Sequence, residues 1–231
     1  MLTRHKDRKR ARARYGKEEQ KLQTRRALLD AALDLLEGDK SFASLSLREI
    51  TREVGVVPAA FYRHFSDVEE LGLAVVDEAM GTLRQMIREA RETPLDPERI
   101  IKRSVETLVR HVHANRRHFR FIAREMYGGR SALRERIHRE IQSFISELAL
   151  DLGRLPWLSK WSSEDLQMIA GLMVNAMVSI AQSIMDAPPD RPQAEAEILR
   201  IAEKQLLLIS LAVPQWRPAA AVKPASSGSE S

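Results

Sequence analysis

The side chains best suited to contact a nucleic acid lie in one short stretch, SLREITREVGVVPAAFYRHF, which spans residues 46–65. Arg48 offers a guanidinium that can donate two hydrogen bonds to O6 and N7 of guanine. Tyr62, Arg63 and His64 add a hydroxyl, a second guanidinium and an imidazole, which can donate to phosphate oxygens. The alternative is a generic helical hairpin with polar residues on its surface, and the spacing favours DNA binding.

Two short helices joined by a tight turn are predicted to position these side chains. Ser46 and Glu49 form the S-x-x-E pattern of a capping box, which predicts that a helix begins at Leu47. Gly55 follows that helix, where a residue that tolerates positive φ commonly ends one. Pro58 suits the first turn of the next helix, because its missing N–H needs no partner there.

The second helix has an apolar side and a slim polar side. Phe61 and Phe65 are four residues apart and can anchor the helix to a core. Small and polar residues face the other way, as in a recognition helix laid in a major groove. The residues that we expect to face DNA in this stretch are Ser46, Arg48, Pro58, Ala59, Ala60, Tyr62, Arg63 and His64.

Positive charge is concentrated in the first part of the chain. Residues 1–65 carry 15 Lys and Arg against nine Asp and Glu, a net charge of +6, whereas the remaining residues carry −1. A basic segment joined to a nearly neutral one is the electrostatic pattern of a DNA-binding half and a second half with another task. The absence of cysteine excludes disulfides, thiolate metal sites and cysteine nucleophiles.

Several other classes of protein are not expected. The N-terminus lacks the apolar core of a signal peptide, and no run is expected to reach membrane-spanning length, so we expect a cytoplasmic protein without membrane insertion. No nucleophile–base pair, glycine-rich phosphate loop or metal triad is visible, so we expect no enzyme. His111 and His113 lie on different faces of one helix, and His118 lacks a partner at ligand spacing, so we expect no metal or cofactor.

Two runs of the sequence carry a resemblance to a known family. SFASLSLREITREVGVVPAAFYRHFSDVEELGLAVVDE resembles the helix-turn-helix of the TetR family of bacterial repressors, and within it the FabR and DesT group. A second run, HFRFIAREMYGGRSALRERIHREIQSFISELA, is similar to the same group, and the two together span about residues 21–150. Val68 departs from the wider family, in which many members carry a phosphate-binding lysine, so that contact is not expected here.

The resemblance implies an all-α fold with two domains, an N-terminal three-helix domain that holds the helix-turn-helix and a C-terminal helical domain that binds a ligand and dimerises. Four segments are expected: a disordered basic arm over 1–17, the DNA-binding domain over 18–67, the ligand-binding and dimerisation domain over 68–213, and a flexible tail over 214–231. In the family the last two helices pair with those of a second subunit. The surplus apolar surface of residues 163–213 fits such a homodimer on a palindromic double-stranded DNA operator.

Periodic apolar residues predict the helices of both domains. A second capping box, Ser66 with Glu69, predicts the start of a long helix shared by the two domains. The expected helices, besides the two of the helix-turn-helix, cover residues 18–37, 67–92, 97–115, 116–127, 131–152, 162–186 and 193–213.

The resemblance also implies roles for three arginines near the DNA. Arg25 and Arg26, at the start of the first helix, would lie near the DNA backbone, and Arg48 would reach a base edge. Solvated surface arginine is an equally good interpretation of Arg25 and Arg26. For Arg48 the alternative is a surface ion pair with Glu49.

Resemblance further implies a repressor of genes for unsaturated fatty acid synthesis or desaturation, with long-chain acyl-CoA or acyl-ACP as the effector. Flexible and aromatic residues would surround the acyl chain: Phe119, Phe121, Met126, Phe144, Met168, Met173 and Met177. Arginines at a helix start would meet the phosphate of the carrier: Arg116, Arg117 and Arg120. Ordinary core packing is the alternative for the apolar set. A TetR-type repressor of another apolar molecule, such as a drug or an aromatic compound, is the alternative function.

The first 17 residues contain eight Arg or Lys and a single acidic residue, Asp7. Almost nothing in this segment is apolar, so we expect it to be disordered when free. It is either an idle solvated tail or an arm that follows phosphates or enters the minor groove beside the recognition helix. The sequence favours neither alternative.

Overall fold

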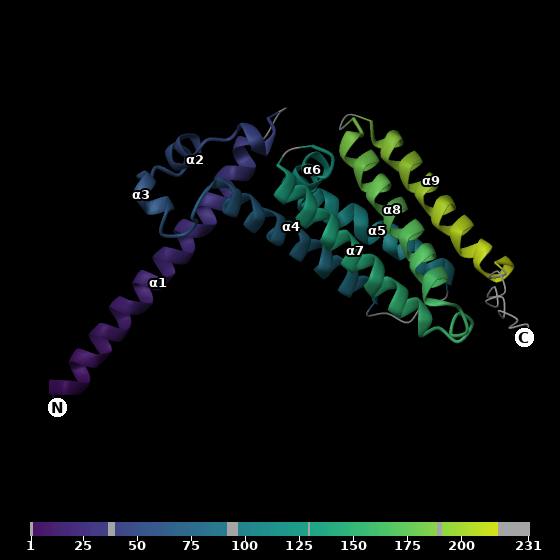
Figure 1. The fold of residues 1–231 in the computed structure, drawn as a ribbon, viewed down its shortest axis with the longest axis horizontal. Coiled ribbons are helices and arrows are strands. Elements are labelled where there is room, and N and C mark those ends of the chain that lie inside the picture. The colour runs from purple at the N-terminus through teal and green to yellow at the C-terminus, as the bar shows by residue number, and fades with distance from the viewer. Residues whose placement is uncertain (1, 37–39, 92–96, 129, 189–190, 217–231) are drawn as a thin grey trace, which may run out of the picture. The chain divides into compact units, whose positions relative to one another are not determined.

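The computed structural model describes residues 2–36, 40–91, 97–128, 130–188 and 191–216, and its secondary structure over these ranges is helical throughout (Figure 1). The all-α prediction is therefore confirmed. In chain order the elements are α1 (Leu2–Leu35), the 3-10 turn η1 (Phe42–Ser44), α2 (Leu47–Val54), α3 (Pro58–Phe61), α4 (Val68–Arg91), α5 (Pro97–Ala114), α6 (Arg116–Glu125), α7 (Ser131–Gly153), α8 (Ser163–Asp186), α9 (Pro192–Ala212) and η2 (Val213–Gln215).

The helices group into two compact units, which are described one at a time. The first unit consists of residues 1–94 and 106–140, and the second of residues 95–105 and 141–231. The first unit therefore contains α4, α6 and the start of α7 in addition to α1, α2 and α3.

The core of the first unit is built from the apolar stripes of its helices. Leu28 and Ala32 of α1 are fully buried, as the periodicity of this helix predicts. Phe61 and Phe65, which flank the turn after α3, are buried beside them at 0% and 1% exposure. Leu71 of α4 completes the same layer at 0% exposure. Helix α2 packs on α1 with Ile50 at 0% exposure, and α3 packs on α2 with its own buried residue, Phe61.

The second unit is held by contacts between α7 and α8. Ile145 and Ala149 of α7 pack against Ala170 of α8, and leucine and valine side chains of the same helices surround them. The indole N–H of Trp216 donates to a carboxylate oxygen of Asp165 over 2.9 Å, which ties the chain after η2 to the start of α8. The first residues of the expected flexible tail are therefore ordered, and the remainder of that tail, residues 217–231, lies outside the described residues.

Helices α8 and α9 leave a row of large apolar side chains exposed. The exposed members are Met168, Leu172, Ile201, Leu208 and Leu211. By length and composition alone, α8 is also apolar enough to cross a membrane, and it is the one such helix among the described residues. This corrects the expectation that no run would reach that length. The helix is rich in alanine, methionine and isoleucine, which suit a helix covered on more than one side equally well.

The starts of two helices differ from the predicted ones. Helix α1 begins at Leu2, although residues 2–17 were expected to be disordered. Composition excludes a packed core for this segment, but arginine, lysine and alanine favour helix once a packed helix follows them. Helix α4 is capped by Asp67, which accepts from the N–H of Glu70 over 2.8 Å, and the carboxylate of Glu70 accepts from the N–H of Ser66. The predicted Ser66–Glu69 box is therefore one residue out of register.

Candidate nucleic-acid interface

The predicted capping box at the start of α2 is confirmed. The Ser46 hydroxyl accepts from the N–H of Glu49 over 3.3 Å, and the Glu49 carboxylate accepts from the N–H of Ser46 over 3.0 Å. The Ser46 hydroxyl also donates to the Glu49 carboxylate over 2.7 Å, and this hydroxyl and the Ser46 N–H hold the pKa of Glu49 below its usual value, because they stabilise its ionised form. Gly55 ends the helix with φ at +72°, the left-handed conformation that a side chain other than glycine's rarely adopts.

The recognition segment after Gly55 is shorter than a regular helix. Only Pro58–Phe61 is α-helical, and the chain then continues as hydrogen-bonded turns, with the N–H of His64 donating to the carbonyl of Phe61 over 2.8 Å. Phe61 and Phe65 face inward from both ends of these turns, with ring centroids 5.6 Å apart. The segment is therefore a rigid, aromatic-backed turn rather than the helix through Phe65 that the sequence predicts.

The residues expected to face DNA surround this turn and the start of α2. Ala60 and His64 are half-buried. The exposed members are Ser46, Arg48, Pro58, Ala59, Tyr62 and Arg63. Burial lowers the pKa of His64, and the positive charges of Lys21, Arg25 and Arg63 lower it further. The surface that they form is thus mainly polar, with the guanidinium groups of Arg48 and Arg63, a composition that suits contact with phosphates and base edges.

Arg25 and Arg26 are neighbours in the sequence with different surroundings. The Arg25 guanidinium lies 4.3 Å from the centre of the Phe65 ring and donates to the backbone carbonyl of His64 over 3.1 Å. Arg25 therefore fastens α1 to the recognition turn. Arg26 turns the other way, toward Asp30 and Glu78, and its guanidinium is held by these carboxylates. In this geometry the Arg26 guanidinium is engaged by carboxylates, and its contact with DNA phosphate stays a prediction.

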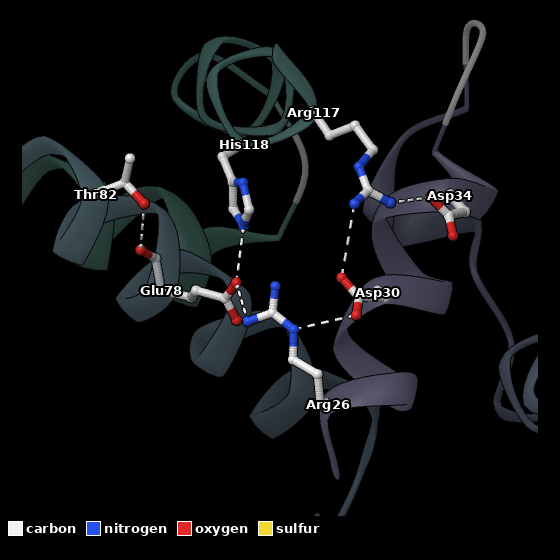
Figure 2. Close-up of polar contacts among 7 residues, drawn as sticks. All are labelled: Arg26, Asp30, Asp34, Glu78, Thr82, Arg117 and His118. Atoms are coloured by element: carbon white, nitrogen blue, oxygen red, sulfur yellow. Dashed lines mark hydrogen bonds and ion pairs between the residues drawn. The ribbon is translucent and has the colours of Figure 1, made fainter. Parts of the chain in front are cut away.

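The carboxylates around Arg26 belong to a charge network that joins three helices, α1, α4 and α6 (Figure 2). Glu78 of α4 accepts from Arg26 over 2.6 Å and lies 3.1 Å from Nε2 of the buried His118 on α6. Arg117 of α6 reaches back to α1, where it pairs with Asp34 and Asp30. Because each helix supplies charges to both of the others, the network fixes the place of α1 against α4 and α6.

A second contact between the helix-turn-helix and α6 is made by Phe42, in the loop before α2. Its side chain is fully buried and meets the edge of Phe121 with 6.0 Å between the ring centroids. Its backbone N–H donates to the carboxylate of Glu125 over 3.0 Å, and Glu125 is 1% exposed. Gly72 of α4 leaves room for the Phe42 ring, since a Cβ at this position would lie 2.6 Å from it. We call this arrangement the Phe42 plug.

Arg124 of α6 completes the junction from the other side of the loop. Its guanidinium donates to the backbone carbonyls of Leu36 and Lys40, over 2.9 and 3.2 Å. Carbonyls at the end of a helix have no partner within it, and a cation there interacts favourably with the helix dipole. Helix α1 therefore ends on a guanidinium supplied by α6.

The residues expected to bind an acyl ligand fall in both units. Those in the first unit are Phe119, Phe121, Met126, Arg116, Arg117 and Arg120, and those in the second are Phe144, Met168, Met173 and Met177. Phe121 packs on Phe42, and Arg117 is held by two aspartates, so both have partners within the first unit, and their contact with an acyl ligand stays a prediction. Met168 is 42% exposed and lines an open groove on α7 and α8 rather than an enclosed space.

A small pocket in the first unit lies between α1 and α6. Arg120 and Arg124 line it together with Leu33, Leu36 and the buried Glu125. One carboxylate oxygen of Glu125 has no hydrogen-bond partner among the described residues. The space is small and polar at its rim, which suits a water molecule better than an acyl chain.

Two of the three histidines considered as metal ligands, His111 and His118, each pair with a single carboxylate. His111 lies 3.1 Å from Glu89, and His118 lies at the same distance from Glu78. Within the described ranges no group of three or more potential ligands could hold a metal ion.

Several residues of this junction were missed by sequence reasoning. Phe42 stands in a loop outside any apolar period, and Glu125 looks like one more polar residue of a helix. The hydrogen bond between them joins positions 83 residues apart, and helical periodicity gives no information about contacts at that separation. An isolated aromatic in a polar loop, followed by a serine cap, was the one available signal.

Two family models match the chain. Residues 28–75 match bacterial regulatory proteins of the tetR family, and residues 97–211 match the C-terminal domain of tetracyclin repressor-like proteins. The first match contains α2 and α3, and the second runs from α5 to α9.

Solved structures show the same fold at low sequence identity. The fatty acid degradation regulator FadR from Bacillus halodurans is 17% identical, with a TM-score of 0.59, covering 80% of this chain and 94% of that one. A putative fatty acid metabolism regulator from Clostridium perfringens is 15% identical, with a TM-score of 0.60 and coverage of 78% and 97%. AibR, solved with isovaleryl coenzyme A and operator DNA, is 14% identical, with a TM-score of 0.59 and coverage of 78% and 96%.

Proposed function

The chain belongs to the TetR family of bacterial regulatory proteins, and from that membership we propose that it represses genes of unsaturated fatty acid synthesis or desaturation. Regulators of this family are DNA-binding proteins without enzymatic activity, and they act as dimers. Operator affinity would be set by a long-chain acyl thioester, acyl-CoA or acyl-ACP. The sequence resemblance to the FabR and DesT group supports the choice of genes.

The observation that carries DNA binding is the exposed, basic surface held rigidly on aromatic side chains. Arg48 stands at the capped start of α2, and Tyr62 and Arg63 follow α3 on a turn backed by Phe61 and Phe65. A protein that must place side chains against base edges needs such pre-organisation, because movement of the turn would weaken its discrimination between bases. Arg48 would read a base, and Tyr62 and His64 would bind phosphate.

Support for an acyl thioester comes from three sides. AibR, which shares the fold, binds isovaleryl coenzyme A, and two other structures with this fold are described as fatty acid regulators. Methionines of α8, Met173 and Met177, have the flexible side chains that adapt to an acyl chain. Because Arg117 is held by aspartates of α1, Arg120, which lines the small pocket between α1 and α6, is the better candidate for the carrier phosphate.

The experiment begins with selection of an operator from a random DNA library by the purified protein. Operator affinity is then measured with palmitoyl-CoA, with oleoyl-CoA, with CoA alone and with no addition. We expect the two acyl thioesters to change the affinity differently, and CoA alone to leave it unchanged. Arg120→Gln should weaken the acyl-CoA response, whereas Arg139→Gln, an exposed change on α7, should not.

Two outcomes would contradict the proposal at different levels. Failure to select any duplex would remove the operator-binding function itself. A selected operator whose affinity ignores both acyl thioesters would favour another apolar effector, such as a drug or an aromatic compound. Lipid found by native mass spectrometry in the purified protein would identify the chain length.

A further inference from the structure

The N-terminal half of α1 extends beyond the packed part of the first unit (Figure 1). Burial in this helix begins at Leu28, and all described side chains from Gly16 to Gln23 are exposed. A helix of this length without apolar packing is only marginally stable in water, so apolar packing is not what would keep this segment helical. Its composition points to another partner, because eight of the first 17 residues are Arg or Lys.

The place where this helix leaves the unit is the recognition turn. Arg25 donates to the carbonyl of His64 and stacks on Phe65, so α1 passes beside the residues proposed to contact DNA. An α-helix rises about 1.5 Å per residue, which puts Lys17 about 12 Å and Leu2 about 35 Å from Arg25 along the axis. The second distance is about one turn of B-DNA. The basic segment therefore has the reach to meet phosphates outside a half-site.

From this placement we propose that residues 2–17 form a second DNA-contacting element, which binds the phosphates of the duplex that flanks the half-site. We call it the basic arm, and the inference rests on the proposed function of operator binding. The arm binds the backbone without reading bases, since eight of its 16 residues are Arg or Lys and none is Asn or Gln.

The charge pattern supports this partner over a purely solvated helix. Like charges four residues apart on one helix are unfavourable, and the sequence places Lys6 and Arg10, and Arg8 and Arg12, at this spacing. Phosphates alongside would remove that repulsion and release counterions, which is the main source of non-specific DNA affinity. Glu18 and Glu19 separate the arm from the turn, so the contact is expected on the flank and not at the half-site itself.

The test compares three full-length proteins on two duplexes. The arm variant carries Arg8→Gln, Lys9→Gln, Arg10→Gln and Arg12→Gln. The control variant loses four exposed cations of the second unit: Lys102→Gln, Arg103→Gln, Lys160→Gln and Lys204→Gln. One duplex contains the selected operator alone, and the other adds ten base pairs of unrelated sequence on each side. Affinity is measured by fluorescence anisotropy as a function of salt concentration.

For the wild type we expect tighter binding and a steeper salt dependence on the flanked duplex. Each phosphate contact adds about 0.9 to the slope of log K against log salt, so two or more contacts per arm add at least about 1.8. The arm variant should bind both duplexes with the same slope, and the control variant should behave like the wild type. All three proteins should recognise the same operator sequence.

Three results would overturn the proposal. If the wild-type protein binds both duplexes with the same affinity and the same salt dependence, the arm makes no contact with the flanks. If the control variant loses as much affinity for the flanked duplex as the arm variant does, the effect comes from net charge and not from the arm. Arm-dependent binding to vesicles of anionic lipid, with no flank dependence on DNA, would assign the arm to a membrane surface. In each case recognition of the operator core by the wild type would leave the proposed function standing, and its absence would remove both.

Discussion

Arg48 and Arg52 are two exposed arginines on α2, one helical turn apart, and only the first stands at the capped end of the helix. We expect Arg48→Ala to relax selectivity at one position of each half-site, by about 1–3 kcal/mol, because a bidentate contact with guanine is lost. Arg52→Ala serves as the matched control and should leave discrimination unchanged. The measurement is affinity for the operator and for its single-base variants. Unchanged discrimination in Arg48→Ala would show that another residue reads the base.

His64 is the residue at which pH should enter DNA binding. Its pKa is lowered in the free protein, by burial and by the cations Lys21, Arg25 and Arg63, so the imidazole is neutral at pH 7. A nearby phosphate would stabilise the protonated form and raise that pKa. Binding would then take up a proton, and operator affinity should rise as the pH falls below about 6.5, the usual pKa of histidine.

The same shift predicts the opposite trend for folding stability. Below pH 6.5 the unfolded chain binds more protons at this position than the folded chain, so the free energy of unfolding falls as the pH decreases toward the lowered pKa. His64→Asn should reduce both trends, and we expect its operator affinity to vary less between pH 7.5 and 5.5 than that of the wild type. If the variant shows the pH dependence of the wild type in both measurements, His64 does not bind phosphate.

At the scale of helices, the Phe42 plug joins the loop before α2 to α4 and α6. Gly72→Ala would place a methyl group 2.6 Å from the Phe42 ring, so the ring must move. We expect a loss of about 1–3 kcal/mol in the free energy of unfolding, the usual effect of overpacking. We also expect weaker operator binding under conditions where the variant is folded, because Phe42 leads directly into α2.

Gly81→Ala is the matched control for this experiment. Gly81 lies on the same helix, is exposed, and has nothing within 4 Å of an added Cβ. Alanine there should be neutral or stabilising by up to about 1 kcal/mol, because glycine is a poor helix former. Urea denaturation of both variants gives the comparison. Equal stability of the two would mean that Phe42 adapts at no cost and that the plug transmits nothing to α2.

Local patterns predicted the elements better than the contacts between them. The helices from α5 to α9 begin and end within one or two residues of the predicted positions, because each has a clear apolar period. In addition, α5 and α9 begin at a proline, and α8 is capped by Ser162. The register error at Asp67 arose because Ser66 and Asp67 both suit an N-cap and both have a glutamate three residues later. The length of α1 was missed because composition reports on packing and not on helix propagation from a packed neighbour.

The candidate site divides in the same way. The capping box and the positive φ of Gly55 were predictable, since both are determined by neighbours in sequence. The different surroundings of Arg25 and Arg26 were not, because they depend on Phe65 and Glu78, which come from other elements. Burial of Glu125 against the N–H of Phe42 lies equally beyond a single sequence.

At the scale of the whole molecule, the exposed apolar residues of α8 and α9 predict how two copies associate. A two-fold dimer would present two recognition turns to half-sites about 34–36 Å apart. We expect Leu208→Glu combined with Ile201→Glu to give monomers that lose operator affinity, because charged groups cannot be buried unpaired in the interface. Analytical ultracentrifugation and anisotropy supply the two measurements.

Leu150→Glu provides the control for the dimer prediction. Leu150 lies on α7 and is 68% exposed, against 70% for Leu208, so the two changes differ in place and hardly in exposure. The control should remain a dimer with wild-type operator affinity. A stable monomer that still binds the full operator tightly, made by the Leu208 and Ile201 changes, would show that the apolar row has another use.

The junction formed by Phe42 and Arg124 has a consequence for how this protein can be cut and recombined. A fragment that ends at residue 67 would expose the Phe42 ring and leave the end of α1 without the guanidinium that caps it. Such a fragment is not a free-standing module. An engineered chimaera that gives this DNA specificity to another sensor must also carry Gly72, Phe121 and Glu125, so the inherited unit is larger than the helix-turn-helix.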